Sequence, residues 1–220
     1  MPTALLRDDD DVQAREALIL GQPPRIAPLE PADYPADAYT MAEGEHEVAV
    51  GRTAAMLARQ RRDPARPLSD HTATLMRHPE LYRAQMSYGL QLNLRSALPP
   101  RDRELLILRT GWLCQAPFEW GEHVLIAKRI GVTSEEIERI TQGPEAPGWD
   151  EHERALLRAA DELHLDAMIS DATWEALSRR LDERQMIELP CIVGHYHLIA
   201  FYQNSLRMRP RAENLGLSAR

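Results

Sequence analysis

The sequence predicts an all-α protein, and three observations lead to this prediction. From residue 41 onward, apolar residues recur at the three- and four-residue spacing of an amphipathic helix. Prolines, capping residues and glycines divide this pattern into segments of helical length. Strand-like alternation and Asn-Gly or Asp-Gly hairpin signals are absent from the sequence. We therefore expect a helical domain over residues 41–220, preceded by an arm of different composition over residues 1–40.

The arm is rich in proline and begins with an acidic cluster. Proline fixes the backbone and removes a hydrogen-bond donor, so a long regular element is not expected here. One short helix is predicted over Asp11–Leu20, capped by Asp9 or Asp10. The stretch Pro23–Pro35 is expected to be extended. Two interpretations stay open, a loose tail and an arm that lies on a neighbouring subunit.

The first helices of the domain are defined by apolar spacing and by proline. Glu45–Arg61 carries spaced apolar residues, and Leu68–Met76 is a shorter segment. Pro79 suits a first helical turn, so a helix is predicted to continue over Leu81–Leu94. A pair of prolines then interrupts the pattern before the next segment.

The central helices are expected on either side of a break at Pro117. Arg101–Leu113 is a dense apolar run, and Phe118–Ile130 follows the break and ends at Gly131, a favourable residue for a helix C-terminus. The later helices begin at capping residues such as Thr133, Ser170 and Asp182. They are predicted from Thr133 to near Gly143 and over Glu151–Leu165, Ala172–Arg180 and Glu183–Met208.

Charge and composition exclude several classes of function. The net charge of -8 argues against binding to nucleic acid or to an anionic membrane. No apolar run reaches the ~18 residues of a membrane helix, and aspartates stand where a secretion signal would be basic, so we expect a cytoplasmic protein. Cys114 and Cys191 are not at CxxC spacing, which excludes a disulfide framework and a thioredoxin-like pair.

The strongest chemical signal combines Glu104, Glu119 and His123. Glu119 and His123 are four residues apart, so they share one helix face. Glu104 stands in an apolar run, where a buried carboxylate needs a partner or a shifted pKa. A Glu beside a His forms an acid–base pair that can work near neutral pH. The alternative is an ordinary pair on a helix surface.

The segment Leu98–Ile140, LPPRDRELLILRTGWLCQAPFEWGEHVLIAKRIGVTSEEIERI, resembles the core motif of the carboxymuconolactone decarboxylase family, which includes the alkylhydroperoxidase AhpD. The segment Glu188–Asn204 is similar to the family's last helix, and the resemblance covers about residues 45–208. It implies an AhpD-like helical bundle, assembly into trimers or hexamers, and a role in the breakdown of aromatic compounds.

The resemblance also indicates which branch of the family this chain follows. Peroxidase members carry two cysteines before the histidine, and those positions here are Ala116 and Glu119. Without an attacking and a resolving thiol, disulfide exchange is not available. The chain instead resembles the decarboxylase branch. This implies that His123 is the acid–base residue, that Glu119 orients it or shares its proton, and that Glu104 is the second carboxylate.

The resulting hypothesis is a cofactor-independent lyase that moves protons on a small organic acid or lactone, with isomerase or hydrolase as variants. A non-catalytic ligand-binding or oligomeric protein is the alternative, and an AhpD-like peroxidase is disfavoured. No cofactor and no metal are expected, since a carboxylate–histidine metal site that adds His195 to the three residues would lack a second Glu-x-x-His motif.

Five further residues are candidates for substrate binding. Phe118 could form a wall of the pocket, and Arg101 or Arg109 could bind a substrate carboxylate. His195 or Tyr196 could line the pocket, although a hydrogen-bonded core histidine is the simpler interpretation of His195.

Overall fold

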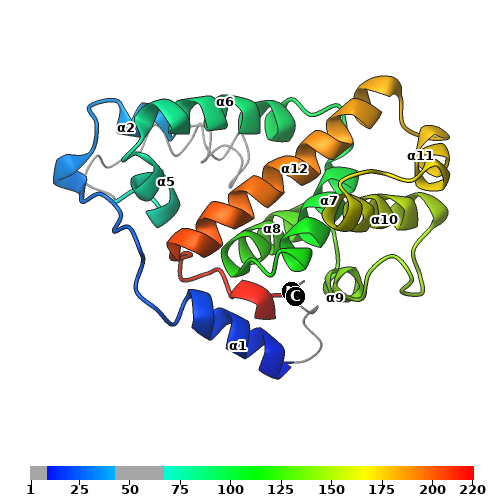
Figure 1. The fold of residues 1–220 in the computed structure, drawn as a ribbon, viewed down its shortest axis with the longest axis horizontal. Coiled ribbons are helices and arrows are strands. Elements are labelled where there is room, and N and C mark those ends of the chain that lie inside the picture. The colour runs from blue at the N-terminus through cyan, green and yellow to red at the C-terminus, as the bar shows by residue number, and fades with distance from the viewer. Residues whose placement is uncertain (1–8, 43–66) are drawn as a thin grey trace.

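The computed structural model describes residues 9–42 and 67–220, and its regular structure over these ranges is helical throughout (Figure 1). The all-α prediction is therefore confirmed. The helix expected over Glu45–Arg61 lies outside the described residues. None of the helices in the described ranges is long and apolar enough to cross a bilayer.

The helices begin and end close to the positions that the sequence predicts. Three capping boxes, at Thr133, Asp150 and Asp182, satisfy the first backbone amides of α9, α10 and α12. The elements are α1 Asp9–Ile19, η1 Pro31–Asp33, α2 Ala38–Met41, α5 Asp70–Leu75, α6 Pro79–Leu94, α7 Pro100–Leu113, α8 Pro117–Arg129, α9 Ser134–Gln142, α10 Glu151–Asp166, α11 Asp171–Ser178, α12 Glu183–Leu206 and η2 Gly216–Ser218.

Helix α7 lies at the centre of the fold. It contacts α8, α9, α10 and α12, which pack around it (Figure 1). Eleven of its 14 residues are buried, and they include the charged residues Asp102, Glu104 and Arg109. The apolar run Leu105–Leu108 is fully buried in the main hydrophobic core. A polar side chain that is buried on α7 therefore needs a partner inside the protein.

The N-terminal segment packs on its own chain in the described range. Val12 of α1 belongs to the main core, and Glu16 accepts a hydrogen bond from the backbone of Leu217 at 2.6 Å. Arg15 Nε donates to the carbonyl of Gln115 at 3.1 Å. Further along, the amide of Leu29 donates to the carbonyl of Ala73. Residues 9–42 are therefore not a loose tail, and the short 3-10 segment Pro31–Asp33 interrupts the stretch Pro23–Pro35 that was expected to be extended.

The C-terminal segment approaches α8 closely at Gly121, where a methyl group would lie 1.7 Å from Asn214 Oδ1. Asn214 donates to the carbonyl of Phe118 and accepts from the amide of Gly216. We expect Gly121→Ala to lower the free energy of unfolding by about 1–3 kcal/mol in urea denaturation, because the clash outweighs the better helix propensity of alanine.

Gly194 offers a matched control for this substitution. It also lies in a helix, α12, but a methyl group there would meet nothing within 4 Å. Gly194→Ala should stabilise the protein by up to about 1 kcal/mol. Equal effects of the two substitutions would show that the contact between Gly121 and Asn214 does not limit stability.

Candidate functional site

Three side chains from α7 and α8 meet in a buried cluster. His123 Nδ1 lies 2.7 Å from Glu104 Oε2, and His123 Nε2 lies 3.2 Å from Glu119 Oε1. Glu104 is 1% exposed, and Glu119 and His123 are each 5% exposed. The imidazole therefore lies between two carboxylates, one bound to each ring nitrogen. The structure brings together the three residues that the sequence singles out as catalytic.

The two carboxylates determine the charge on His123. Burial alone would lower its pKa, but the charges and hydrogen bonds of Glu104 and Glu119 outweigh burial and raise the pKa from 6.5 to about 10. Burial alone would raise the pKa of Glu119, but its contacts with His123 keep the pKa of this carboxyl below its ordinary value. At neutral pH the cluster holds an imidazolium and an ionised Glu119.

Helix α12 forms one wall of the cluster through Tyr196. Its ring stands edge-on to the His123 ring, with 4.9 Å between centroids. The Tyr196 hydroxyl donates to Asn93 Oδ1 at 2.8 Å, and Arg103 donates to the backbone carbonyl of the same asparagine. Arg103 also lies 3.4 Å from Glu104 Oε1, the carboxylate oxygen that does not contact His123. Tyr196 therefore limits the space beside His123, while its own hydroxyl is engaged.

On the other side, Glu119 is close to residues that the sequence interpretation missed. Gln203 of α12 hydrogen-bonds Glu119, and His71 of α5 adds a charge interaction with the same carboxylate. Gln203 Nε2 also lies 3.2 Å from His71 Nδ1. The ring of Phe118 packs 5.8 Å from His71. His71 is 48 positions before Glu119 in a short helix, and no spacing in the sequence links the two.

Two polar atoms of α12 close to the cluster are buried without a hydrogen-bond partner among the described residues. They are Nδ1 of His195 and Oε1 of Gln203. Burial lowers the pKa of His195, and the charges of Glu119, His123 and His71 also act on it. Because buried polar atoms are nearly always hydrogen-bonded, these two mark where a polar ligand would find partners.

Arg101 and Arg109 do not reach the cluster. Arg101 of α7 bridges Glu136 and Glu153, which lie at the starts of α9 and α10. Arg109 is 3% exposed and forms a bidentate pair with Asp161 of α10, at 2.6 and 3.0 Å. The guanidinium donors of both residues are occupied by helix-to-helix contacts, so these contacts do not support the predicted substrate role.

The two cysteines are free and lie outside the cluster. Cys114 is the C-cap of α7, and Cys191 is in the first half of α12. Burial raises the pKa of the Cys114 thiol to about 12, with a smaller contribution from Glu119. A thiol with this pKa is a poor nucleophile at neutral pH.

Comparison with known proteins supports the family resemblance. Residues 79–162 match the model of the carboxymuconolactone decarboxylase family, a range that runs from α6 into α10 and includes Glu104, Glu119 and His123. Among curated proteins, no match to the sequence was found.

Solved structures with the same fold include an alkylhydroperoxidase AhpD core, an uncharacterised peroxidase-related protein from Ralstonia eutropha JMP134 (20% identity, 87% of this chain and 95% of that chain, TM-score 0.69). A peroxidase-related protein from Silicibacter sp. TM1040 is also similar, with 16% identity, coverage of 88% of this chain and 96% of that chain, and a TM-score of 0.67. A cysteine-to-alanine variant of the debrominase Bmp8 in complex with 2,3,4-tribromopyrrole is similar as well, with 15% identity, coverage of 88% of this chain and 95% of that chain, and a TM-score of 0.69. At these identities the likeness is one of fold, and the AhpD-like helical fold is confirmed.

Proposed function

Taking as premise that residues 79–162 match the carboxymuconolactone decarboxylase family, we propose that this chain is a proton-transfer enzyme that acts on a small lactone or organic acid. The observation that carries the proposal is the buried His123, held between Glu104 at 2.7 Å and Glu119 at 3.2 Å. Decarboxylation, the reaction of a carbon–carbon lyase, is the reaction that this arrangement supports best.

The charge state of the cluster supports a role for His123 as an acid. With a pKa raised to about 10, the imidazole carries both protons at neutral pH. Nδ1–H is held by the shorter contact with Glu104, while Nε2–H has the longer contact with Glu119. The Nε2 proton is therefore the one that can be delivered, and Glu104 fixes the orientation of the ring.

In the proposed reaction, the bond between the substrate carboxylate and its carbon breaks, and carbon dioxide leaves. The electron pair remains on the substrate as a dienolate, whose negative charge the imidazolium stabilises. His123 Nε2 then gives its proton to carbon, and the ring regains a proton from solvent. Glu119 accepts the hydrogen bond of Nε2–H before transfer. His195 Nδ1 and Gln203 Oε1 are available to hydrogen-bond the polar groups of the substrate.

A thiol-based peroxidase mechanism has less support. Such a mechanism needs an attacking and a resolving thiol. The two positions that correspond to the peroxidase cysteines are occupied by Ala116 and Glu119, both buried. Glu119 contacts His123 through its carboxylate, which can take part in proton transfer but not in disulfide exchange.

The test is turnover of carboxymuconolactone and related lactone acids, followed by release of carbon dioxide and, in D₂O, by deuterium at the product carbon. Glu119→Gln keeps the shape of the side chain and should lower kcat by about 100-fold or more, with His123→Asn at least as severe. Cys191→Ser is the matched control and should retain full activity.

Three outcomes would contradict the proposal. Unchanged turnover in Glu119→Gln and His123→Asn would remove the cluster from the reaction. Binding of lactone acids without turnover across the panel would favour the ligand-binding alternative. Thiol-dependent consumption of peroxide that is lost on replacing the cysteines would favour a peroxidase. Assembly into trimers or hexamers, implied by the family resemblance, stays a prediction that light scattering can check.

A further inference from the structure

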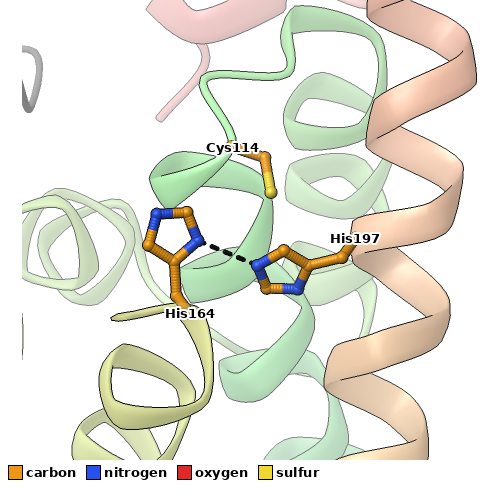
Figure 2. Close-up of side chains that lie close together, drawn as sticks. All are labelled: Cys114, His164 and His197. Atoms are coloured by element: carbon orange, nitrogen blue, oxygen red, sulfur yellow. Dashed lines mark hydrogen bonds between the residues drawn. The ribbon is translucent and has the colours of Figure 1, made fainter. Parts of the chain in front are cut away.

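A second group of chemically reactive side chains lies where three helices meet, and it does not include any residue of the proposed acid–base cluster. Cys114 is the C-cap of α7, His164 is in the last turn of α10, and His197 is near the middle of α12. Figure 2 shows the three side chains facing one another. Their Sγ, Nδ1 or Nε2 atoms all lie within 4.8 Å of one another.

The hydrogen bonds of His197 define which of its nitrogens faces the group. Nδ1 lies 2.8 Å from the carbonyl of Val193, and a carbonyl only accepts, so Nδ1 carries the proton. In the neutral ring, Nε2 therefore presents a lone pair, and it lies 2.8 Å from Nδ1 of His164. Nδ1–H of His164 therefore donates to this lone pair. For both rings to bind one ion, the His164 proton would move to its own Nε2, which leaves His164 Nδ1 and His197 Nε2 to coordinate. A backbone carbonyl that fixes the other ring nitrogen, as at His197, is typical of metal-binding histidines.

Charges of both signs lie near the group. Arg15 acts on Cys114, and Asp161 and Arg109 act on His164. Cys114 and His164 are also at the C-terminal ends of α7 and α10, where the helix dipole places partial negative charge.

We propose that Cys114, His164 and His197 form a binding site for a zinc ion. One thiolate and two imidazoles are a ligand set suited to this borderline-soft ion, and three protein ligands leave a fourth tetrahedral position for water or a small ligand. Ligand atoms around tetrahedral zinc are about 3.3–3.6 Å apart. Small side-chain rotations would separate the two nitrogens and bring the sulfur closer. As the zinc–sulfur bond forms, the thiol proton leaves to solvent.

His164 is exposed, whereas Cys114 and His197 are half-buried. The ion would therefore join the ends of α7 and α10 to the middle of α12 and remain reachable from solvent through His164. His197 lies two positions after His195 and so on a different face of α12. No spacing in the sequence associates His197 with a cysteine 83 positions earlier, and only the packing of the helices brings them together.

The experiment is titration of the purified full chain with Co²⁺, used as a spectroscopic substitute for zinc, and then competition with Zn²⁺. We expect one ion per chain, a cobalt–thiolate charge-transfer band in the near ultraviolet, and visible bands of a tetrahedral ion. Cys114→Ser should abolish the charge-transfer band. His164→Ala should weaken binding by about 100-fold or more, since even outer-shell changes weaken metal binding by roughly 10- to 100-fold.

The controls separate this site from surface binding and from misfolding. Cys191→Ser should keep the band and the affinity. His78→Asn removes an exposed histidine outside the group and should keep both as well. Circular dichroism establishes whether each variant is folded. If Cys114→Ser does not fold, His164→Ala, whose truncated ring is exposed, carries the test. Binding without a thiolate band, equal affinity in His164→Ala, or less than one ion per chain would overturn the proposal.

Discussion

Replacing His123 with alanine is expected to lower the free energy of unfolding by about 3–5 kcal/mol at pH 7, which is the typical cost of breaking a buried ion pair. The substitution leaves Glu104 and Glu119 buried without the imidazolium that contacts both of them. Urea denaturation measures the loss. His78→Asn, at an exposed histidine that caps α6, should stay within about 0.5 kcal/mol of the wild type.

The loss in His123→Ala should also depend on pH. In the wild type, the pKa of His123 is raised from 6.5 to about 10, so its stabilisation is fully present below pH 6.5 and is lost as the pH rises through 10. The pKa of Glu119 is lowered from 4.5, so its stabilisation is present above pH 4.5 and is lost as the pH falls further. Wild-type stability should decline between pH 6.5 and 10, and this decline should be smaller in the variant.

Acid conditions provide the complementary check. Without the histidine, Glu119 loses the contacts that lower its pKa and should become easier to protonate, so the stability difference between the wild type and His123→Ala should shrink near about pH 5. Denaturation at about pH 5, 7 and 9 covers both effects. A deficit that is the same at all three pH values would mean that lost packing, and not charge, explains the result.

Replacing Arg109 with alanine is the second substitution with a large expected effect. Arg109 is 3% exposed, and its guanidinium group pairs with Asp161 through two hydrogen bonds and donates to the carbonyls of Ile140 and Thr141 at 2.8 and 3.1 Å. Its removal leaves a carboxylate and two carbonyls without these donors and opens a cavity. We expect a loss of about 3–5 kcal/mol in urea denaturation.

Arg101→Ala is the matched comparison on the same helix. Arg101 also bridges helices, but its side chain is 36% exposed, and ion pairs at such positions contribute about 1 kcal/mol or less. Arg109→Lys keeps the charge but loses the planar fork, and an intermediate loss is expected. If Arg109→Ala unfolded like the wild type and only weakened substrate binding, the substrate role inferred from the sequence would be supported.

The contrast between the cluster and these arginines shows what the sequence can predict. The helices were predictable because the spacing of apolar residues and the capping residues are local properties of the sequence. The pairing of Glu119 with His123 was also predictable, since the two residues are one turn apart on α8. Glu104 stood out as a carboxylate in an apolar run, and the family resemblance then assigned it to the same site as Glu119 and His123. The partners of Arg101 and Arg109 lie 31–52 positions away in the chain, and His71 reaches Glu119 from α5. Such pairs depend on how helices pack, which local spacing does not encode.

The same reasoning applies to the N-terminal segment and to the proposed zinc site. Proline content argued against a long element in the arm, and within the described residues 9–40 the longest element is the 11-residue α1, but proline content carried no information on where α1 would dock. Cys114, His164 and His197 come from three helices that are adjacent only in the folded chain. Helix α12 also carries exposed apolar side chains, among them Ile187, Leu198 and Phe201. These side chains are compatible with the predicted self-association.

The central position of α7 has a consequence for hydrogen exchange. Because other helices pack around it, its backbone amides can exchange with solvent only when the domain opens as a whole. Their protection factors should therefore report the global free energy of unfolding. Glu104 and the Cys114 cap stand about 15 Å apart along this one helix. Deuterium uptake in α7 would thus register a ligand bound at either end through one common slowing of exchange.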